Sequence, residues 1–355
     1  MTASNRGPLD IRRLTPDMEP ALTEFLQGHV EATVFHEPWW FRVLSETYDH
    51  QCDYWIAQEE RKICGIFPVV SLRVPLLGRK MIALPYQYHC GAPLASSEPV
   101  FNALVDHAKK VAHEKNADYI EVRSFYELPA LERLGFAAVD TQLSKTIVPL
   151  QGLDIKGLRE GHRKELRKAL ASGVRIERDS TLKGLDTFWK LYRLDGRELG
   201  GPQAGWRYFS SLYSNAGDQY RLWLAREASD CIGGLITLDD GAMVFARNGS
   251  YSSPRAKAVR LGRALIWHSM VDAASRGCSR YDLGISWVRD KGLIDFKEGW
   301  QGVTQPVRAY VLPIKSCAPQ PGSYFEGYQL AKAVWRRLPI PIVDRLGHQI
   351  TRWIG

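Results

Sequence analysis

The sequence predicts a mixed α/β fold that is built from two similar units in tandem, each with a largely antiparallel sheet. The main observation is an internal repeat, in which three pairs of segments keep the same order and nearly the same offset. These pairs are Trp55 and Trp223, 168 residues apart, Ile120-Glu121-Val122 and Tyr281-Asp282-Leu283, 161 apart, and Arg133-Leu134-Gly135-Phe136 and Lys297-Glu298-Gly299-Trp300, 164 apart. Because the three matches agree, we interpret the repeat as a duplication.

Each copy contains the same succession of helices and strands. Each tryptophan begins a strand-like run that is followed, after a short polar turn, by a second run, as in a β-hairpin. A long helix, a strand, a short helix and a last strand then follow. In the first copy we expect elements at 9–14, 17–29, 38–48, 53–59, 62–74, 79–84, 99–114, 118–123, 128–134 and 136–148. In the second copy we expect a helix at 186–198, strands at 219–227, 231–238 and 242–248, a helix at 257–276, and strands at 280–283 and 307–312.

A basic amphipathic helix is predicted at 158–173, between the two copies. Its leucines share one face, whereas Arg163 and Lys164 begin two i, i+4 pairs of cations, and Gly173 ends the helix. The cationic face is either an ordinary solvated surface or a contact for phosphate groups. We therefore predict a first domain at 1–150, a second domain at 151–321 that begins with this helix, and a tail at 322–355.

The tail is a candidate membrane-binding segment. Leu338-Pro339-Ile340-Pro341 divides it into two short helices that carry apolar residues, five cations and a terminal tryptophan, Trp353. Such a segment either lies on an anionic membrane surface or packs on the parent domains.

The composition excludes several classes of protein. Of the 355 residues, 45% are hydrophobic and 24% are charged, which is typical of a globular chain and not of a disordered one. The first 15 residues lack the apolar core of a secretory signal, so we expect a cytoplasmic protein, with the inner face of the membrane as an alternative place for it. The six cysteines form no CxxC pair, and no metal site is expected. The net charge of +8 favours anionic partners such as phosphate groups, RNA or anionic lipid, and no DNA partner is expected.

The repeated unit resembles a known family. Tandem GNAT-type units, each with a central hairpin, a long helix, a strand and a final turn with Gly and an aromatic residue, are similar to the FemAB-like transferases over residues 35–312. The resemblance rests on four segments: Phe35-His36-Glu37-Pro38-Trp39-Trp40, Arg163-Lys164-Glu165-Leu166-Arg167-Lys168-Ala169, Tyr281-Asp282-Leu283-Gly284, and Asp295-Phe296-Lys297-Glu298-Gly299-Trp300. The stretch from Gly65 to Leu94, together with the tail, resembles the branch that occurs with exosortase and exopolysaccharide systems.

The resemblance implies transfer of an acyl or aminoacyl group to a nucleophile on a cell-envelope or saccharide precursor. No resident cofactor is implied, and the donor is an aminoacyl-tRNA or an acyl-CoA. GNAT acetyltransferases bind the CoA pyrophosphate with an Arg/Gln-x-x-Gly-x-Gly/Ala loop before the long helix. Gly262 and Ala264 fit this loop, but Val259 stands at its first position and Arg260 comes one place late. This departure weakens the case for acetyl-CoA as the donor.

Lys297 and Asp282 are the candidate catalytic residues. Phe296 and Lys297 correspond to the Phe-Lys pair of the family motif, and Lys297 could bind a phosphate or stabilise the oxyanion of the transition state. Its alternative is a surface lysine beside Glu298. Asp282 could accept a proton or orient a hydroxyl, although an acid at the end of a strand more often has a structural role.

The candidate substrate-binding residues are Phe296, Arg163, Lys164, Tyr86, Tyr88, His89 and Arg260. Tyr86, Tyr88 and His89 lie in a polar aromatic loop that could line the acceptor site, or could simply pack. The sequence contains no nucleophile elbow, P-loop or HExxH motif, so direct transfer without a covalent enzyme intermediate is the expected mechanism. The alternatives are an acetyl-CoA-dependent N- or O-acetyltransferase and a non-catalytic RNA- or membrane-binding assembly factor.

Overall fold

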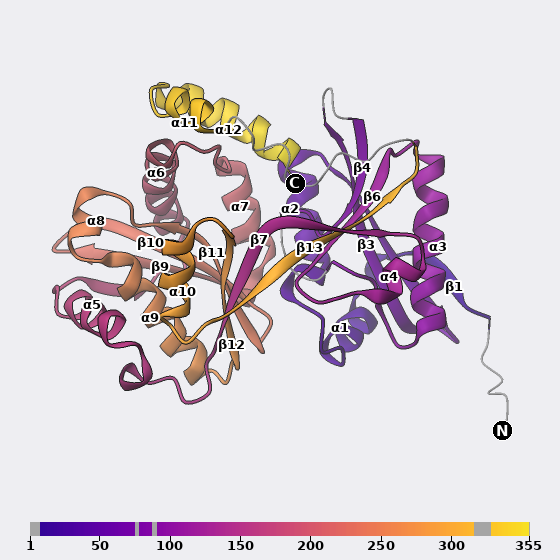
Figure 1. Cartoon of the computed structure of the whole chain (residues 1–355), viewed down its shortest axis with the longest axis horizontal. Helices are drawn as coiled ribbons and strands as arrows, with labels where there is room; N and C mark the ends of the chain where they lie inside the picture. Colours follow the sequence, from indigo (N-terminus) through magenta and orange to yellow (C-terminus); the bar gives the residue numbers. More distant parts are fainter. Residues whose placement is uncertain (1–7, 75–77, 87–90, 316–327, 355) are drawn as a thin grey trace. The chain divides into compact units, whose positions relative to one another are not determined.

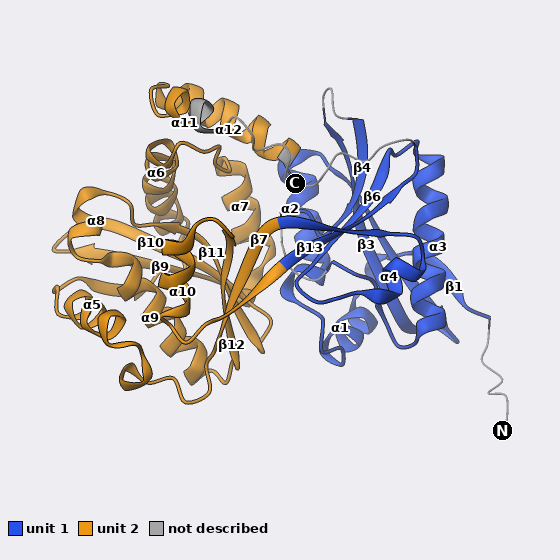
Figure 2. Ribbon diagram, viewed as in Figure 1, with its two compact units in different colours: residues 1–141, 307–324, 355 blue, residues 142–306, 325–354 orange. Residues whose placement is uncertain are grey.

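The computed structural model describes residues 8–74, 78–86, 91–315 and 328–354 (Figure 1). The chain forms two compact units (Figure 2). Unit 1 contains the described residues up to Thr141 and those from Val307 to Lys315. Unit 2 contains Gln142–Pro306 and the two helices near the C-terminus.

Unit 1 is a twisted sheet that is covered by helices. Its strands follow the order β1 (Asp10–Arg13), β2 (Gln51–Glu59), β3 (Lys62–Val74), β4 (Gly78–Ala83), β6 (Tyr119–Ser124) and β13 (Val303–Pro313), and the short β5 (Leu94–Ala95) pairs with β3. Neighbouring strands are antiparallel except β4 and β6, which are parallel. The helices are η1 (Pro16–Met18), α1 (Glu19–Gln27), η2 (Val34–His36), α2 (Pro38–Tyr48), α3 (Glu98–Glu114) and α4 (Pro129–Arg133).

Unit 2 repeats this arrangement. Its strands follow the order β8 (Arg175–Arg178), β9 (Tyr220–Glu227), β10 (Asp230–Asp239), β11 (Met243–Ser250), β12 (Arg280–Trp287) and β7 (Ala137–Pro149). Again only one step, between β11 and β12, is parallel. Its helices are η3 (Ile155–Gly157), α5 (Glu160–Leu170), α6 (Leu182–Leu199), α7 (Trp206–Asn215), η4 (Gly217–Gln219), α8 (Pro254–Ala258), α9 (Leu261–Ser275) and α10 (Lys291–Glu298).

The predicted duplication is confirmed by the register of the strands. Trp55 in β2 lies opposite Phe67 in β3, and Trp223 in β9 lies opposite Leu235 in β10. In each unit the tryptophan is therefore on the strand between the edge strand and the long central strand. The predicted mixed α/β fold class with tandem, largely antiparallel sheets is confirmed as well.

The last strands of the two sequence copies are exchanged between the units. β7 ends the first copy, yet its residues from Leu143 pair with β12 in unit 2. β13 ends the second copy, and its residues from Arg308 pair with β6 in unit 1. Neither compact unit is therefore one continuous stretch of sequence, because the sheet of each unit is completed by a strand from the other copy.

Two regions depart from the expected elements. The helix expected at 257–276 is divided into α8 and α9, because Arg260 has a left-handed backbone (φ 54°) that ends one helix and begins the next. The strand β8 and the helix α7 were not predicted. Both belong to the half of unit 2 in which the expected elements were sparse.

The described part of the tail forms two helices, α11 (Tyr328–Trp335) and α12 (Ile340–Ile354), which pack on unit 2. Arg193 of α6 forms an ion pair with Asp344 of α12 at 3.1 Å, and Arg336 donates a hydrogen bond to the Glu198 carbonyl at 2.8 Å. No helix among the described residues is both long and apolar enough to span a membrane.

Glycines at equivalent places allow a helix to pack closely on each sheet. A Cβ atom at Gly65 in β3 would lie 2.7 Å from Val100 Cγ1 and 2.9 Å from Leu104 Cδ1 of α3. A Cβ atom at Gly233 in β10 would collide with Leu261 at the start of α9. The close approach of the long helix to the sheet therefore depends on the absence of a side chain at this position.

We expect Gly65→Ala to destabilise the protein by about 1–3 kcal/mol, because the added methyl group overpacks the contact with α3. Gly28→Ala is the control in the same unit, since a Cβ atom there would have its nearest neighbours at 3.7 Å. Thermal and denaturant unfolding measure both variants. An unfolding free energy for Gly65→Ala equal to that of Gly28→Ala would contradict the packing argument.

Candidate active site

Three charged side chains meet in the interior of unit 2. Lys145 of β7 and Asp282 of β12 are each only 1% exposed, and Lys145 Nζ lies 2.6 Å from Asp282 Oδ2. Lys297 of α10 is 5% exposed. The sequence placed Asp282 on a strand and Lys297 in a turn motif, and the fold brings both to the same bulge of β12.

The bulge lies where the pairing between β12 and β7 skips from Asp282 to Ile285. Gly284 has a left-handed backbone there (φ 73°), and its N–H donates to Asp282 Oδ1 at 2.7 Å. Lys297 Nζ donates to the carbonyls of Gly284 and Ile285, each at 2.8 Å. Asp282 and Lys297 therefore hold the bulge from its two ends, and one of the three ammonium hydrogens of Lys297 is not used by these bonds.

Positive charge exceeds negative charge in this cluster. Burial lowers the pKa of Lys145 to about 8, against the opposing effect of Asp282. Burial also lowers the pKa of Lys297 to about 8, and Asp282 again opposes the shift. The charge of Arg247 on β11 also lowers the pKa of Lys145. The charge of the exposed Asp290 raises the pKa of Lys297 and so opposes the effect of burial. Two buried lysines around one buried carboxylate suit a site that receives a negatively charged group.

The cluster lies where the two parallel strands part. Only three residue pairs join β11 and β12, and the last is Phe245 with Asp282, although both strands continue for five more residues. Beyond this point Ser286 Oγ is buried and has no hydrogen-bond partner among the residues that the structure describes. A buried hydroxyl without a partner, on the strand that carries Asp282, is a further polar group that a ligand could satisfy.

Phe296, next to Lys297, belongs to an aromatic cluster between α5, α9 and α10. Its ring lies 5.5 Å from that of His162 and 6.2 Å from that of Trp300, and the Arg263 guanidinium lies 4.7 Å from its centre. Burial lowers the pKa of His162 to about 4, so this histidine is neutral at about pH 7. The cluster fixes α10 on its neighbours and so helps to orient Lys297.

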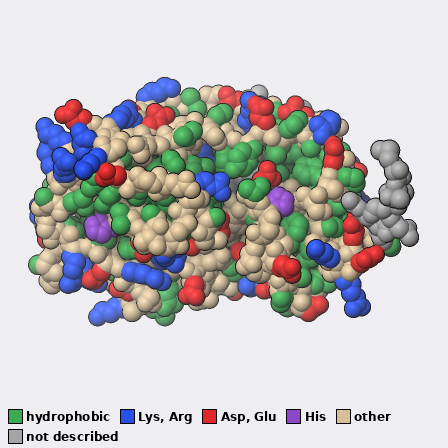
Figure 3. Space-filling model, turned by 90° about the horizontal axis from the view of Figure 1, so that it is seen from below, with side chains coloured by type: hydrophobic (Ala, Val, Ile, Leu, Met, Phe, Trp, Pro, Cys, Tyr) green, Lys and Arg blue, Asp and Glu red, His purple; other side chains and the backbone are tan. Residues whose placement is uncertain are grey.

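Arg163, Lys164 and Arg260 form a separate group on α5 and at the start of α9. Arg163 donates to the Lys156 carbonyl at 2.9 Å, and Lys164 is exposed. Arg260 forms an ion pair with Glu165, and hydrogen bonds from Lys168 and Arg260 lower the pKa of Glu165 to about 2. In Figure 3 Lys and Arg side chains gather at the end of the molecule where Figure 1 draws α5 and α8. This basic surface is available to an anionic substrate, but Arg260 already has a carboxylate partner.

The aromatic loop residues belong to unit 1. The Tyr86 hydroxyl lies 2.5 Å from His50 Nε2, and the ring of Tyr86 stacks on that of Tyr48 with centres 5.2 Å apart. Tyr86 has a left-handed backbone (φ 65°). Tyr88 and His89 lie outside the described residues. The substrate-binding roles of these three residues stay predictions.

The sequence analysis missed Lys145 and Arg247. Lys145 carries no clear signal, because it lies in a strand that also contains the polar residues Asp140 and Gln142. Arg247 carries no clear signal either, since a cation near the end of a strand is usually solvated. Only the exchange of β7 into unit 2 brings Lys145 to Asp282.

Unit 1 has a buried cluster of different composition at the corresponding place, formed by Lys80, Glu121 and Arg123; burial lowers the pKa of Lys80 to about 8, and Glu121 opposes the shift. Glu121 occupies the register position of Asp282, but it pairs with Arg123 at 2.5 Å on its own strand. Arg133, the counterpart of Lys297 in the repeat, is exposed and pairs with Glu98 at 2.7 Å. Gly91 donates a hydrogen bond to the Arg123 carbonyl at 2.9 Å, where β4 and β6 have parted. Among the described residues, unit 2 thus combines two buried lysines with Asp282, whereas unit 1 combines one lysine and one arginine with Glu121.

Comparison with known proteins identifies similarities of domain and of fold. Residues 156–298 match a family model that is described as an acetyltransferase (GNAT) domain. The fold is similar to that of FemX, with a TM-score of 0.67 and 16% identity over 91% of this chain and 100% of the other. It is also similar to L-PGS from Bacillus licheniformis, with a TM-score of 0.60 and 12% identity over 92% and 99% of the two chains. No curated protein sequence matches the chain.

A third similar structure is a tandem GNAT protein from the clavulanic acid biosynthesis pathway, with a TM-score of 0.56 and 10% identity over 88% of this chain and 100% of the other. These matches show the fold. The chain has a tandem GNAT-type fold, and residues 156–298 in its second unit match the GNAT domain model. The predicted resemblance is confirmed, and the prediction of a GNAT-fold acyltransferase agrees with it.

We expect Asp282→Asn to lower the free energy of unfolding by about 3–5 kcal/mol at about pH 7, because it leaves two buried lysines without their carboxylate. The loss should shrink at about pH 9.5. Both lysines have lowered pKa values near 8, so above that pH they lose their protons in the folded state and the uncompensated charge disappears.

The matched control is Asp295→Asn, since Asp295 is exposed and its ion pair with Arg159 is worth about 0–1 kcal/mol. Urea unfolding of the parent and both variants at the two pH values gives the comparison. A loss for Asp282→Asn that is the same at both pH values would refute the charge-based explanation.

Proposed function

We propose that the protein is a FemAB-type acyltransferase that transfers an aminoacyl or acyl group directly to an amine or hydroxyl of a cell-envelope or polysaccharide precursor. The observation that supports it is the buried cluster of Lys145, Asp282 and Lys297 at the parting of β11 and β12; Asp282 and Lys297 belong to the residues that match the GNAT domain model. Its excess positive charge complements the oxyanion that develops on the acyl carbon as the nucleophile attacks.

In the proposed mechanism Lys297 stabilises this oxyanion with its remaining N–H. The two carbonyl bonds fix the direction of the ammonium group before the substrate arrives, so little reorganisation is needed in the transition state. Asp282 is a positioning residue, because its two oxygens accept from Gly284 and Lys145. Lys145 adds positive charge without leaving its ion pair. The reaction needs no covalent intermediate on the enzyme.

The alternative is an acetyl-CoA-dependent N- or O-acetyltransferase, which the description of the matched family model favours. Two features weigh against it: Val259 stands at the first position of the pyrophosphate loop, and Arg260 pairs with Glu165. A non-catalytic RNA- or membrane-binding role is a third candidate. Titration calorimetry with acetyl-CoA, aminoacyl-tRNA and uncharged tRNA distinguishes the three. Binding of acetyl-CoA alone would favour the acetyltransferase, and equal binding of both tRNA forms would favour the non-catalytic role.

We expect Lys297→Met to lower kcat by about a hundredfold or more with little change in KM, since it removes an interaction that exists only in the transition state. Lys291→Met is the control, because Lys291 is an exposed lysine on the same helix. Steady-state kinetics with a confirmed donor, together with circular dichroism, measure both. If Lys297 bound a ground-state phosphate, KM would rise and kcat would change little. Parental kinetics in a folded Lys297→Met variant would remove Lys297 from the site.

We further propose that α11 and α12 attach the protein peripherally to the cytoplasmic face of an anionic membrane. The inner face of α12 packs on unit 2 through the buried Val343 and Gly347. The outer face carries a second apolar stripe at helical spacing: Ile342 is 45% exposed, Leu346 is 42% exposed and Trp353 is 37% exposed. Arg345 is exposed beside this stripe. Apolar residues beside cations on an outward face are typical of helices that lie in a membrane interface.

Replacing Ile342 and Leu346 together by Ser should reduce binding to phosphatidylglycerol vesicles by at least about tenfold, because two side chains no longer enter the interface. Val271→Ser with Val288→Ser is the control, since these two exposed valines lie outside the tail. Vesicle sedimentation compares the three proteins. Equal sedimentation would show that the tail serves only to pack on unit 2.

A further inference from the structure

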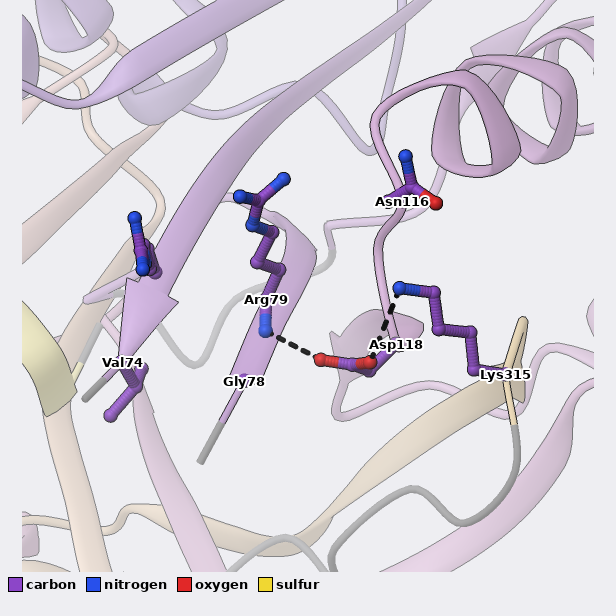
Figure 4. Close-up of a pocket in the computed structure, with 7 residues that line it drawn as sticks. Val74, Gly78, Arg79, Asn116, Asp118 and Lys315 are labelled. Carbon is purple, nitrogen blue, oxygen red and sulfur yellow. Dashed lines mark hydrogen bonds and ion pairs between the residues drawn. The ribbon is translucent and has the colours of Figure 1, made fainter. Parts of the chain in front are cut away.

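A cationic pocket of about 530 Å³ lies in unit 1, away from the cluster described above (Figure 4). The end of β3, the beginning of β4 and the turn before β6 form its walls, together with Lys315, which lies shortly after β13. Its lining residues are Arg73, Val74, Gly78, Arg79, Asn116, Asp118 and Lys315. Figure 4 shows the Arg79 guanidinium and the Lys315 amine on opposite sides of the hollow, with Asn116 beside it.

The single carboxylate of the pocket is engaged by the protein itself. Asp118 Oδ2 accepts the backbone N–H of Arg79 at 2.6 Å, and Asp118 Oδ1 lies 4.0 Å from Lys315 Nζ. Gly78 has a left-handed backbone (φ 91°), and a Cβ atom there would collide with Asp118. Asp118 therefore fixes the start of β4 and leaves the guanidinium of Arg79 directed away from it.

Lys315 lies within ion-pair distance of Asp118, but the two arginines of the pocket have no carboxylate partner among the described residues. Arg79 donates only a long bond, 3.4 Å, to the Lys115 carbonyl. Arg73 has no ion-pair or hydrogen-bond partner among the residues that the structure describes. Three cations and one carboxylate line the pocket, so its net charge is positive. A neighbouring pocket of about 390 Å³ shares Arg73, Arg79 and Asn116. Its walls also contain Lys80, Glu114 and Lys115, and Lys115 forms an ion pair with Asp53.

The duplication provides an internal control for this arrangement. In unit 1 the Asp118 N–H donates to the Arg79 carbonyl at 2.7 Å, and in unit 2 the Ser279 N–H donates to the Ala242 carbonyl at 2.8 Å. Ala242 and Ser279 precede the parallel pair of β11 and β12 as Arg79 and Asp118 precede that of β4 and β6.

The turn residues correspond as well. Asn116 and Gly277 both have left-handed backbones, with φ values of 53° and 89°. The fold thus forms the same turn with small, uncharged side chains. The cations of unit 1 are consequently not needed to build this turn.

We propose that this pocket binds a phosphate group of an organic ligand. Arginine forks match the oxygens of a phosphate in pairs, lysine adds a point charge, and the Asn116 amide adds a neutral donor. The volume exceeds that of a single phosphate ion, so part of the esterified group would enter with it. The phosphate belongs either to a soluble ester or to a lipid headgroup, and the inference does not depend on the proposed acyl transfer.

The test uses the full chain, the double variant Arg73→Gln with Arg79→Gln, and Lys315→Gln. The control is Lys62→Gln with Lys110→Gln, because both lysines are exposed and lie outside the pocket. Glycerol phosphate and inorganic pyrophosphate are titrated by calorimetry, and vesicles with and without phosphatidylglycerol are sedimented. Thermal unfolding confirms that each variant keeps its fold.

We expect saturable binding by the parent and the control, at least about tenfold weaker binding by the double variant, and a smaller loss for Lys315→Gln. If glycerol phosphate binds in this way, the source is a soluble ester. If only the vesicles show the difference between the parent and the double variant, the source is a lipid headgroup. Parental binding by both pocket variants in every arm, or no saturable binding of any probe by the parent, overturns the proposal.

Discussion

The ion pair between Lys145 and Asp282 is the interaction on which the architecture of unit 2 depends. It joins β12, a strand of the second copy, to β7, the last strand of the first. Both charges are almost completely buried, and a buried charge is tolerated only with a partner. The pair therefore favours a single register between β7 and β12, and this register in turn places the bulge whose carbonyls hold Lys297.

The two units show how a duplicated fold can specialise. Their strand order, their single parallel step and their glycine contacts agree, so the scaffold has been kept. The charged residues differ. Unit 2 has a buried pair of lysines where its parallel strands part, whereas unit 1 has an exposed Arg133 and a buried group of Lys80, Glu121 and Arg123. At the beginning of the parallel strands the difference is reversed. Unit 1 has the cations Arg73, Arg79 and Lys315 there, whereas unit 2 has the uncharged Ala242 and Ser279.

The sequence was sufficient for the fold and for part of the site. Alternating strands and periodic helices are local patterns, so most elements of the first copy could be located, and Trp55 and Trp223 revealed the duplication. Asp282 and Lys297 were identified through their motifs. Lys145 could not be connected to them, because its contact with Asp282 spans 137 positions and arises only from the exchange of β7. The break at Arg260 was also missed, since a left-handed arginine has no propensity signal.

The exchange of β7 and β13 has a consequence for how the chain can fold during synthesis. The sheet of unit 1 lacks its last strand until residues near the end of unit 2 have been made, because β13 follows β6 by roughly 180 positions. The first half of the protein therefore emerges from the ribosome with an unpaired sheet edge at β6. Such an edge can pair with strands of other chains. A chain that stops before β13 would leave that edge uncovered. The sheet of unit 1 can therefore close only after the second copy has emerged.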